Sequence, residues 1–195
     1  MANETALVVI DVQVAIMDGP EPGADPAYRR DEVLAKVGEL LAKARAAGTP
    51  VIHVQHEHAS FPPMQAGAAG WQIHPKAAPR DGETVVRKRA ADAFYGTSLR
   101  AELDRLGVTR LVLAGAESDC CVDTTARRAL SLDYDVILAA DAHTTYAGNG
   151  VLSAEQIVAH HSAMLANLPH PKHEIVVTPT SEITFEHRPR RAGAR

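Results

Sequence analysis

The fold is decided by the stretch RLVLAGAESDCC at residues 110–121, where an apolar strand leads directly into a helix. A continuous apolar run is expected for a strand that is buried on both faces. Similar runs occur at Ala6–Ile10 and Val51–Gln55, and segments with helical spacing of apolar residues separate the runs. This alternation predicts an α/β fold, a Rossmann-like three-layer αβα sandwich around a mostly parallel six-stranded sheet.

The chain divides into ten predicted elements and one domain. Two stretches rich in Pro and Gly, 18–28 and 56–82, interrupt the pattern, and loops of that length are usually functional or mobile. A single domain is expected over 1–185, followed by a basic, flexible tail at 186–195. The predicted strands are Ala6–Ile10, Val51–Gln55, Thr84–Arg87, Arg110–Ala114, Asp135–Ala139 and Glu174–Val177, and the predicted helices are Asp31–Ala47, Thr97–Leu106, Asp119–Leu132 and Ser153–Leu168.

Composition limits the class of protein. The chain has 195 residues, of which 46% are hydrophobic, so it can bury the core of one domain. Its net charge of -4 gives no basic surplus for binding nucleic acid. No apolar run approaches the roughly 20 residues needed to cross a bilayer, and the N-terminus lacks the basic region of a signal peptide. We therefore expect a cytoplasmic protein with neither nucleic-acid nor membrane partners.

Cys120 and Cys121 are the only cysteines, and they are adjacent. Neighbouring cysteines rarely form a disulfide, because the geometry is strained, and a zinc site built of cysteines needs separated ligands. Ligands of open α/β sheets bind beyond the carboxyl ends of the strands. Asp11 ends the first predicted strand, Lys88 follows the third and Cys121 follows the fourth. The sequence therefore predicts a carboxylate, an ammonium and a thiol at one rim.

Cys121 has the best position for a reactive thiol. The start of a helix stabilises an anion, and Lys88 nearby is expected to lower the pKa of the thiol further. Asp11 is placed to take the proton and return it to a leaving group. Backbone N–H groups around Cys121 are suited to a developing oxyanion. Cys120 is expected to point elsewhere and to pack as a small hydrophobic residue.

Five blocks of sequence carry a resemblance to a known family. They are LVVIDVQ (7–13), WQIHP (71–75), VVRK (85–88), LAGAESDCCVDTTA (113–126) and the pair at 141–142. In this order they resemble the isochorismatase-like cysteine hydrolases, which include nicotinamidases and N-carbamoylsarcosine amidases. The resemblance covers nearly the whole chain, from about Ala6 to Phe185.

The resemblance implies a role for each matching residue. Cys121 is then the nucleophile, Asp11 the proton shuttle and Lys88 the electrostatic partner. A cis peptide bond is implied between Ala116 and Glu117, and the N–H groups of Glu117 and Cys121 would form the oxyanion hole. The implied reaction is hydrolysis of a C–N bond in a small amide or lactam through a thioester. Family members that cleave the vinyl ether of isochorismate typically lack the cysteine.

Substrate contacts are expected from five residues. The side chain of Glu117 is expected to reach the pocket and to select a cationic or amine-bearing substrate. Trp71, Phe94 and Tyr95 are either pocket walls or core and subunit contacts, since aromatic residues dominate both. Gln13 completes the predicted set. Among relatives, the streptothricin hydrolases, which open a lactam in a basic antibiotic, are the candidate resemblance for the substrate.

A metal site is the alternative use of three histidines. Nicotinamidases of the family bind a metal after the second strand through an Asp and two His, and the corresponding segment here offers His56 and His58. His74 is a candidate third ligand, but the Asp is missing. We therefore predict no metal and no other cofactor, with these three residues as the candidate ligands.

Four other functions are compatible with parts of the pattern. Isochorismatase-type or nicotinamidase activity and a non-catalytic role in assembly are alternatives within the family. A nucleotide- or flavin-binding domain is disfavoured, because no Gly-rich turn follows the first strand. The switch-point rule also puts His143 and Tyr146 near the rim. A homo-oligomer, a dimer or a tetramer, is expected by resemblance.

Overall fold

The computed structural model describes residues 4–185, so the predicted tail at 186–195 lies outside the described residues. Six strands form one sheet in the order β3-β2-β1-β4-β5-β6, and every neighbouring pair is parallel. The predicted fold class is confirmed. The strands are β1 Thr5–Ile10, β2 Val51–His56, β3 Thr84–Lys88, β4 Arg110–Ala116, β5 Asp135–Thr144 and β6 Ile175–Thr178.

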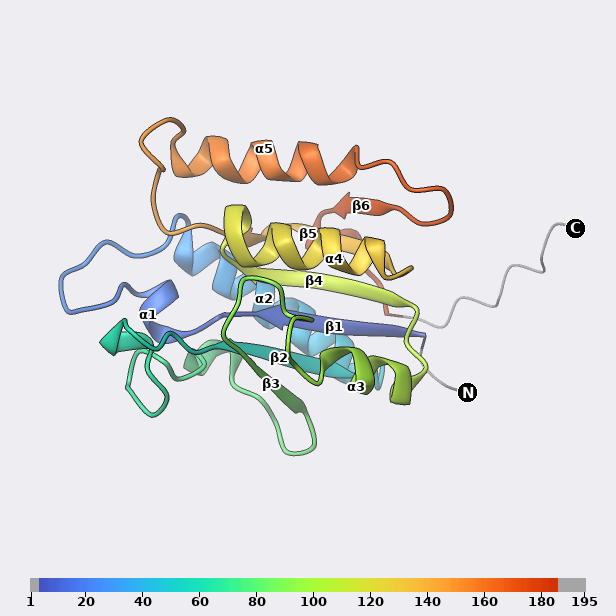
Figure 1. The fold of residues 1–195 in the computed structure, drawn as a ribbon, viewed down its shortest axis with the longest axis horizontal. Coiled ribbons are helices and arrows are strands. Elements are labelled where there is room, and N and C mark those ends of the chain that lie inside the picture. Colours follow the sequence, from blue (N-terminus) through green and yellow to red (C-terminus); the bar gives the residue numbers. More distant parts are fainter. Residues whose placement is uncertain (1–3, 186–195) are drawn as a thin grey trace, which may run out of the picture.

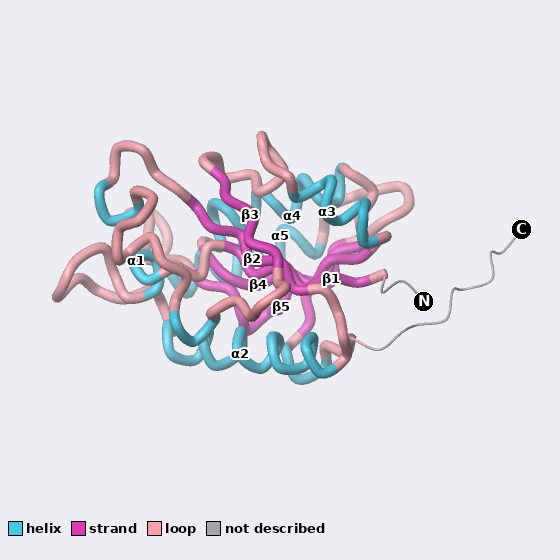
Figure 2. The backbone as a smooth tube through the Cα atoms, turned by 90° about the horizontal axis from the view of Figure 1, so that it is seen from below, coloured by secondary structure: helices cyan, strands magenta, loops and turns pink. Residues whose placement is uncertain are grey.

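Helices cover both faces of the sheet (Figures 1 and 2). Helix α2 packs on one face, while α3, α4 and α5 pack on the other. Because side chains alternate along a strand, β1 contributes Leu7 and Val9 to the α2 side and Val8 and Ile10 to the other. The helices are α1 Val14–Met17, α2 Arg30–Ala46, α3 Leu99–Leu106, α4 Asp123–Ser131 and α5 Ala154–Ala166. None of those described is long and apolar enough to cross a membrane.

The boundaries differ from prediction mainly around the rim. Strand β5 ends at Thr144 instead of Ala139, because its pairing with β4 resumes after a shift in register: Leu113 pairs with Leu138, and Gly115 pairs with His143. The helix predicted from Asp119 begins instead as a π-helical turn, Ser118–Val122, that continues into α4. Helix α1 was not predicted, since four residues are too few to show helical periodicity.

Gly115 brings the ends of β1 and β4 unusually close. Its φ is +124°, and a Cβ built on it would lie 2.0 Å from the carbonyl oxygen of Ile10. Only glycine has both the backbone freedom and the absence of a side chain that this approach requires. Asp11, the residue after Ile10, has a left-handed φ of 51°, a conformation that Asp tolerates better than most residues. The pair of backbone features turns Asp11 toward the start of α4.

Candidate active site

Three side chains from separate elements meet at the carboxyl ends of the strands. The Nζ of Lys88 lies 2.7 Å from Oδ2 of Asp11 and 3.0 Å from Sγ of Cys121. Asp11 follows β1, Lys88 ends β3, and Cys121 lies in the turn after β4. The side chains of Asp11 and Lys88 are both 0% exposed. The structure thus brings together the three residues that the sequence analysis placed at one rim.

Lys88 reaches the site because of the alternation along β3. Val86 and Lys88 are buried, whereas Val85, which precedes them, and Arg87, which lies between them, are exposed. The ammonium also donates to the carbonyl oxygen of Ala90 at 2.9 Å. Its position is therefore fixed by the sheet and by a backbone contact as well as by charge.

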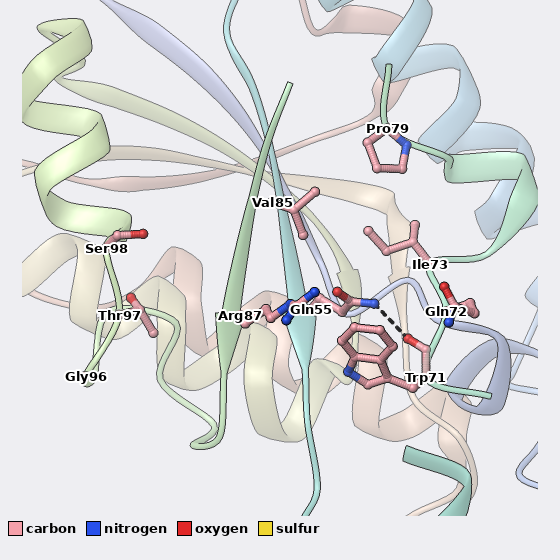
Figure 3. A pocket seen from close by; sticks show the side chains of 10 residues that line it. All are labelled: Gln55, Trp71, Gln72, Ile73, Pro79, Val85, Arg87, Gly96, Thr97 and Ser98. Carbon is pink, nitrogen blue, oxygen red and sulfur yellow. Dashed lines mark hydrogen bonds between the residues drawn. The ribbon is translucent and has the colours of Figure 1, made fainter. Parts of the chain in front are cut away.

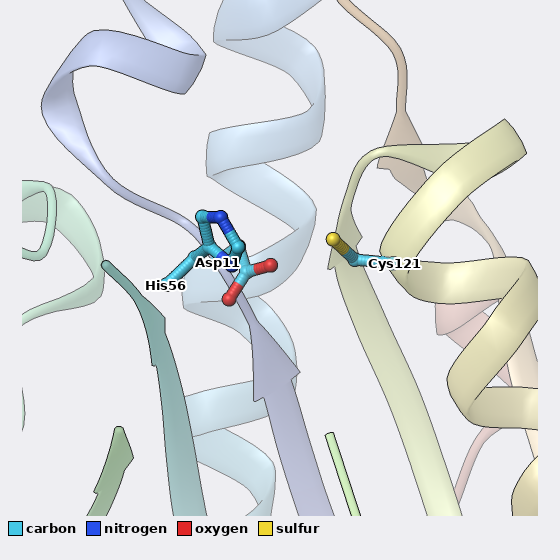
Figure 4. Close-up of side chains that lie close together, drawn as sticks. All are labelled: Asp11, His56 and Cys121. Atoms are coloured by element: carbon cyan, nitrogen blue, oxygen red, sulfur yellow. The ribbon is translucent and has the colours of Figure 1, made fainter. Parts of the chain in front are cut away.

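His56 is a fourth member that the sequence analysis considered only as a metal ligand. Its Nδ1 lies 3.2 Å from Nζ of Lys88 (Figure 4 shows His56 beside Asp11 and near the sulfur of Cys121). Burial lowers the pKa of His56 to about 4, with the charge of Lys88 acting in the same direction. The imidazole is therefore neutral at pH 7, and its Nδ1 accepts a hydrogen bond from the Lys88 ammonium. The contact follows from the pairing of β2 with β3, in which His56 and Lys88 are direct neighbours at the ends of their strands.

Burial controls the ionisation of the acid groups. It raises the pKa of Asp11 well above the ordinary value, and the nearby charge of Cys121 raises it further against the effect of Lys88. Contact with Cys120 and then burial raise the pKa of Cys121, although Lys88 lowers it. The predicted lowering of the Cys121 pKa is therefore wrong. One ammonium compensates one anion, and a second anion in the same buried site is costly.

The Lys88 ammonium therefore compensates a single anion, which lies on either the Asp11 carboxyl group or the Cys121 thiol. Burial lowers the pKa of Lys88, but the charges of Asp11 and Cys121 outweigh that effect and raise it overall. A carboxylate with a raised pKa is a better base for a neighbouring thiol. The arrangement can therefore move a proton from sulfur to carboxylate without changing its total charge.

Cys120 does not pack as predicted. Its side chain is exposed, and its Sγ lies 3.9 Å from that of Cys121. Successive residues of a helical turn point in different directions, so only one of the two thiols can face the sheet. The contact with Cys121 lowers the pKa of Cys120 to about 7, although burial opposes the shift.

The turn before Cys121 carries a cis peptide bond between Ala116 and Glu117, at the position implied by the sequence resemblance. The carbonyl oxygen of Glu117 accepts from the N–H groups of Cys120 and Val122 at 3.1 and 3.0 Å. The side chain of Glu117 is half-buried. Burial raises the pKa of its carboxyl group, and the charges of Asp119 and Asp11 add to this.

The three candidate metal ligands are not brought together. His74 is engaged elsewhere, since its Nδ1 accepts from the N–H of Lys76 and its Nε2 lies 3.4 Å from Asp18. His58 contacts His56 ring to ring, with centroids 6.0 Å apart. Over residues 4–185 the potential ligand atoms within 4.8 Å of one another belong to Asp11, His56 and Cys121. The Lys88 ammonium contacts all three, so this group already surrounds a cation.

Gln13 has a structural position that the sequence analysis missed. The side chain is fully buried. Its amide donates to the carbonyl oxygens of His56 and Trp71 at 2.9 and 2.7 Å, and its Oε1 accepts from the N–H of His56 at 2.7 Å. Both N–H protons are therefore used by backbone groups. Gln13, which was predicted to bind substrate, clamps the long loop to the end of β2.

The predicted aromatic residues lie in three different environments. Trp71 lines a groove at the edge strand β3, with the guanidinium of Arg87 5.0 Å from the ring centroid (Figure 3). Since Arg87 and Lys88 are successive residues of a strand, this groove lies on the face opposite Lys88. Phe94 lies in the core and stacks on Tyr134 with centroids 6.0 Å apart. Tyr95 is 73% exposed.

Comparisons with known proteins identify the family of this chain. The family model described as "Isochorismatase domain" matches residues 5–169. A streptothricin hydrolase of Streptomyces noursei is 43% identical over 141 residues, 72% of this chain and 50% of that protein. An uncharacterized isochorismatase family protein of Escherichia coli O157:H7 is 36% identical over 72% of this chain and 80% of that protein. The chain thus matches about half the length of the streptothricin hydrolases but most of the second relative.

Solved structures show the same fold. The crystal structure of a putative isochorismatase hydrolase from Oleispira antarctica superposes with a TM-score of 0.82 and 31% sequence identity. The match covers 93% of this chain and 96% of that one.

Proposed function

The chain belongs to the isochorismatase family, and from this premise we propose that it is a cysteine-dependent hydrolase. It cleaves the C–N bond of a small amide or lactam through a thioester and uses no cofactor. One observation carries the proposal: a buried ammonium, Lys88, lies within 3.0 Å of both a carboxylate and a thiol. Nucleophilic catalysis by cysteine needs a base beside the thiol and compensation for the charge that develops there.

The reaction begins with a proton transfer from the Cys121 thiol to the Asp11 carboxylate. The sulfur attacks the carbonyl carbon, and the N–H groups of Glu117 and Cys121 bind the oxyanion of the tetrahedral intermediate. Asp11 then protonates the nitrogen as the C–N bond breaks, which leaves a thioester. Asp11 next takes a proton from water, the hydroxide attacks the thioester, and the proton returns to the departing sulfur.

Lys88 keeps the charge balanced throughout this sequence. As the proton moves from Cys121 to Asp11, the negative charge moves from an oxygen 2.7 Å from Nζ to a sulfur 3.0 Å from it. The ammonium therefore faces one anion at each stage. A buried site stabilises such a fixed charge pair more strongly than water does, because the local dielectric is low.

The proposed substrate is a basic amide or lactam. Its support is the half-buried Glu117 carboxyl, close enough to Asp11 to feel its charge, and the similarity to a protein named streptothricin hydrolase. An amine on the substrate would pair with this carboxyl and lower its raised pKa. The proposed assembly is a homodimer or homotetramer, which light scattering measures directly.

The test is hydrolysis of a panel of nicotinamide, carbamoyl compounds and basic lactams, followed as released ammonia or amine for the open-chain compounds and as the mass of one added water for the lactams. With the best substrate, Cys121→Ala is expected to lower kcat by at least about 10⁴-fold. Cys120→Ala is the matched control and is expected to stay within about threefold, because a group outside the bond-making steps contributes little. Full activity in Cys121→Ala contradicts the proposal.

A further inference from the structure

The buried His143 has no part in the mechanism above. The Nδ1 of His143, near the end of β5, lies 2.8 Å from Oγ of Ser118, and its Nε2 lies 3.0 Å from Oγ of Ser162 in α5. His143 is 2% exposed and Ser118 is 0% exposed. The imidazole therefore links three elements, β5, α5 and the turn that carries Cys121, inside the protein.

The hydrogen bonds fix which nitrogen carries the proton. The Ser162 hydroxyl donates to the carbonyl oxygen of Val158 at 2.8 Å, so it accepts from Nε2–H of His143. Nδ1 is then unprotonated and accepts from the hydroxyl of Ser118. Burial lowers the pKa of His143 to about 4, which keeps the imidazole neutral at pH 7.

Ser118 is the point at which this chain of hydrogen bonds meets the turn. It is the first residue of the π-helical turn Ser118–Val122, between Glu117 and Cys121. Two further side-chain contacts hold the turn and the start of α4 against the segment after β5 and against α5. Thr145 donates to Asp119 at 2.7 Å, and His161 lies 3.0 Å from Asp123. Of these three contacts, the one between His143 and Ser118 is the most deeply buried.

We propose that His143 is a positioning residue for the nucleophile. By holding Ser118 against Ser162, it sets the direction of the turn, and with it the Cys121 thiol and the two N–H groups assigned to the oxyanion hole. Misplacement of a reacting group by about 1 Å can lower a rate about 100-fold. The effect on turnover rests on the proposed function, whereas the effect on the Cys121 thiol does not.

The experiment compares His143→Gln with His143→Leu, both in a Cys120→Ser background because the exposed thiol of Cys120 also reacts. Glutamine keeps one donor and one acceptor, while leucine keeps the volume and removes both. The first readout is the rate of Cys121 alkylation by iodoacetamide at fixed pH, with the label assigned by peptide mass. The second is the split between kcat and KM for the best substrate in the panel above.

We expect His143→Leu to change the alkylation rate by at least about 10-fold and to lower kcat by a similar factor, with KM within about twofold. His143→Gln is expected to stay within about threefold of the parent in both. Ser162→Ala removes only the hydrogen bond at Nε2 of His143 and replaces His143→Leu if that variant does not fold. Its alkylation rate and kcat are expected to lie between those of the leucine and glutamine variants.

Two results overturn the proposal. The first is an unchanged alkylation rate and kcat in His143→Leu or in Ser162→Ala. The second is a change in His143→Gln as large as the change in His143→Leu. Because alkylation requires no substrate, the proposal can hold even when no amide in the panel is cleaved. In the converse case, turnover that survives Cys121→Ala removes the proposed function but leaves the alkylation result standing.

Discussion

Two clusters of similar side chains lie at opposite ends of the sheet, and their environments differ sharply. At the carboxyl ends, Asp11, Lys88 and Cys121 are buried and joined by contacts of 2.7–3.0 Å. The amino ends of β5 and β6 carry the second cluster, in which His173 lies 3.0 Å from Asp135 and 3.7 Å from Asp133. The side chain of Asp133 is 69% exposed.

The difference shows that burial, more than residue type, gives a cluster its chemistry. Exposed ion pairs are screened by water and salt and contribute little. At the buried rim each charge depends on its neighbour, and the pKa values of Asp11 and His56 shift strongly. We therefore expect substitutions at the rim to have large, pH-dependent effects and those at the other end to have almost none.

The largest effect on stability is expected at the close approach that forms the rim. In Gly115→Ala the new Cβ meets the Ile10 carbonyl oxygen at 2.0 Å, so the strands must separate. The free energy of unfolding in urea should fall by at least about 4 kcal/mol. Gly48→Ala is the matched control, because its φ of +64° is also left-handed but nothing lies within 4 Å. It should cost about 1 kcal/mol. Equal losses in both would show that the contact at Gly115 is unimportant.

Removing the buried ammonium is expected to come next. Lys88→Met leaves the Asp11 carboxylate without its partner, which should lower the free energy of unfolding at pH 7 by about 3 kcal/mol. Lys88 lowers the pKa of Asp11 in the parent, so its removal raises the folded-state pKa still further above the ordinary 3.8. The folded variant then holds the Asp11 proton to a higher pH than the folded parent does, so the loss should be smallest at low pH and grow as the pH rises.

The control for this prediction is the double variant Asp11→Asn/Lys88→Met. It has no carboxylate at this position, so its stability relative to the parent should lack the added dependence on pH. A Lys88→Met variant as stable as the parent at pH 7 would show that the ammonium does not compensate a buried charge.

A smaller effect is expected from the titration of His143. Its folded-state pKa of about 4 lies below the ordinary 6.5, so the unfolded chain binds the proton first as the pH falls. The contribution of the neutral imidazole is complete above pH 6.5 and is lost between there and pH 4. From pH 7 to pH 5 the parent should lose about 2 kcal/mol more than His143→Gln. Parallel stability curves for the two proteins would contradict the burial of a neutral histidine.

The smallest effect is expected at the exposed cluster. His173→Ala should change the free energy of unfolding by less than about 1 kcal/mol, as is typical of pairs that water reaches: the side chains of His173 and Asp135 are 24% and 44% exposed. It should leave kcat for any cleaved amide unchanged. A measurable loss of turnover in this variant would break the contrast between the two ends of the sheet.

The sequence predicted the strands, the sheet and the meeting of Asp11, Lys88 and Cys121, because these follow from apolar runs and from the rule that strands end at a common rim. It did not predict the raised pKa of Cys121 or the exposure of Cys120. Both depend on how deeply each atom is buried and on how many anions share one ammonium. The role of Gln13 as a clamp and the contact of His143 with Ser118 involve partners distant in the chain, for which no local pattern exists.

The central claim, that Cys121 forms a covalent intermediate, is tested most directly by intact mass of reactions quenched in acid before the first turnover is complete. With a lactam substrate the account predicts a transient increase equal to the whole substrate, since the opened ring stays attached. Peptide mapping should locate it on Cys121, and Cys120→Ala should show it too. Turnover without any adduct, together with full activity in Cys121→Ala, would contradict the account.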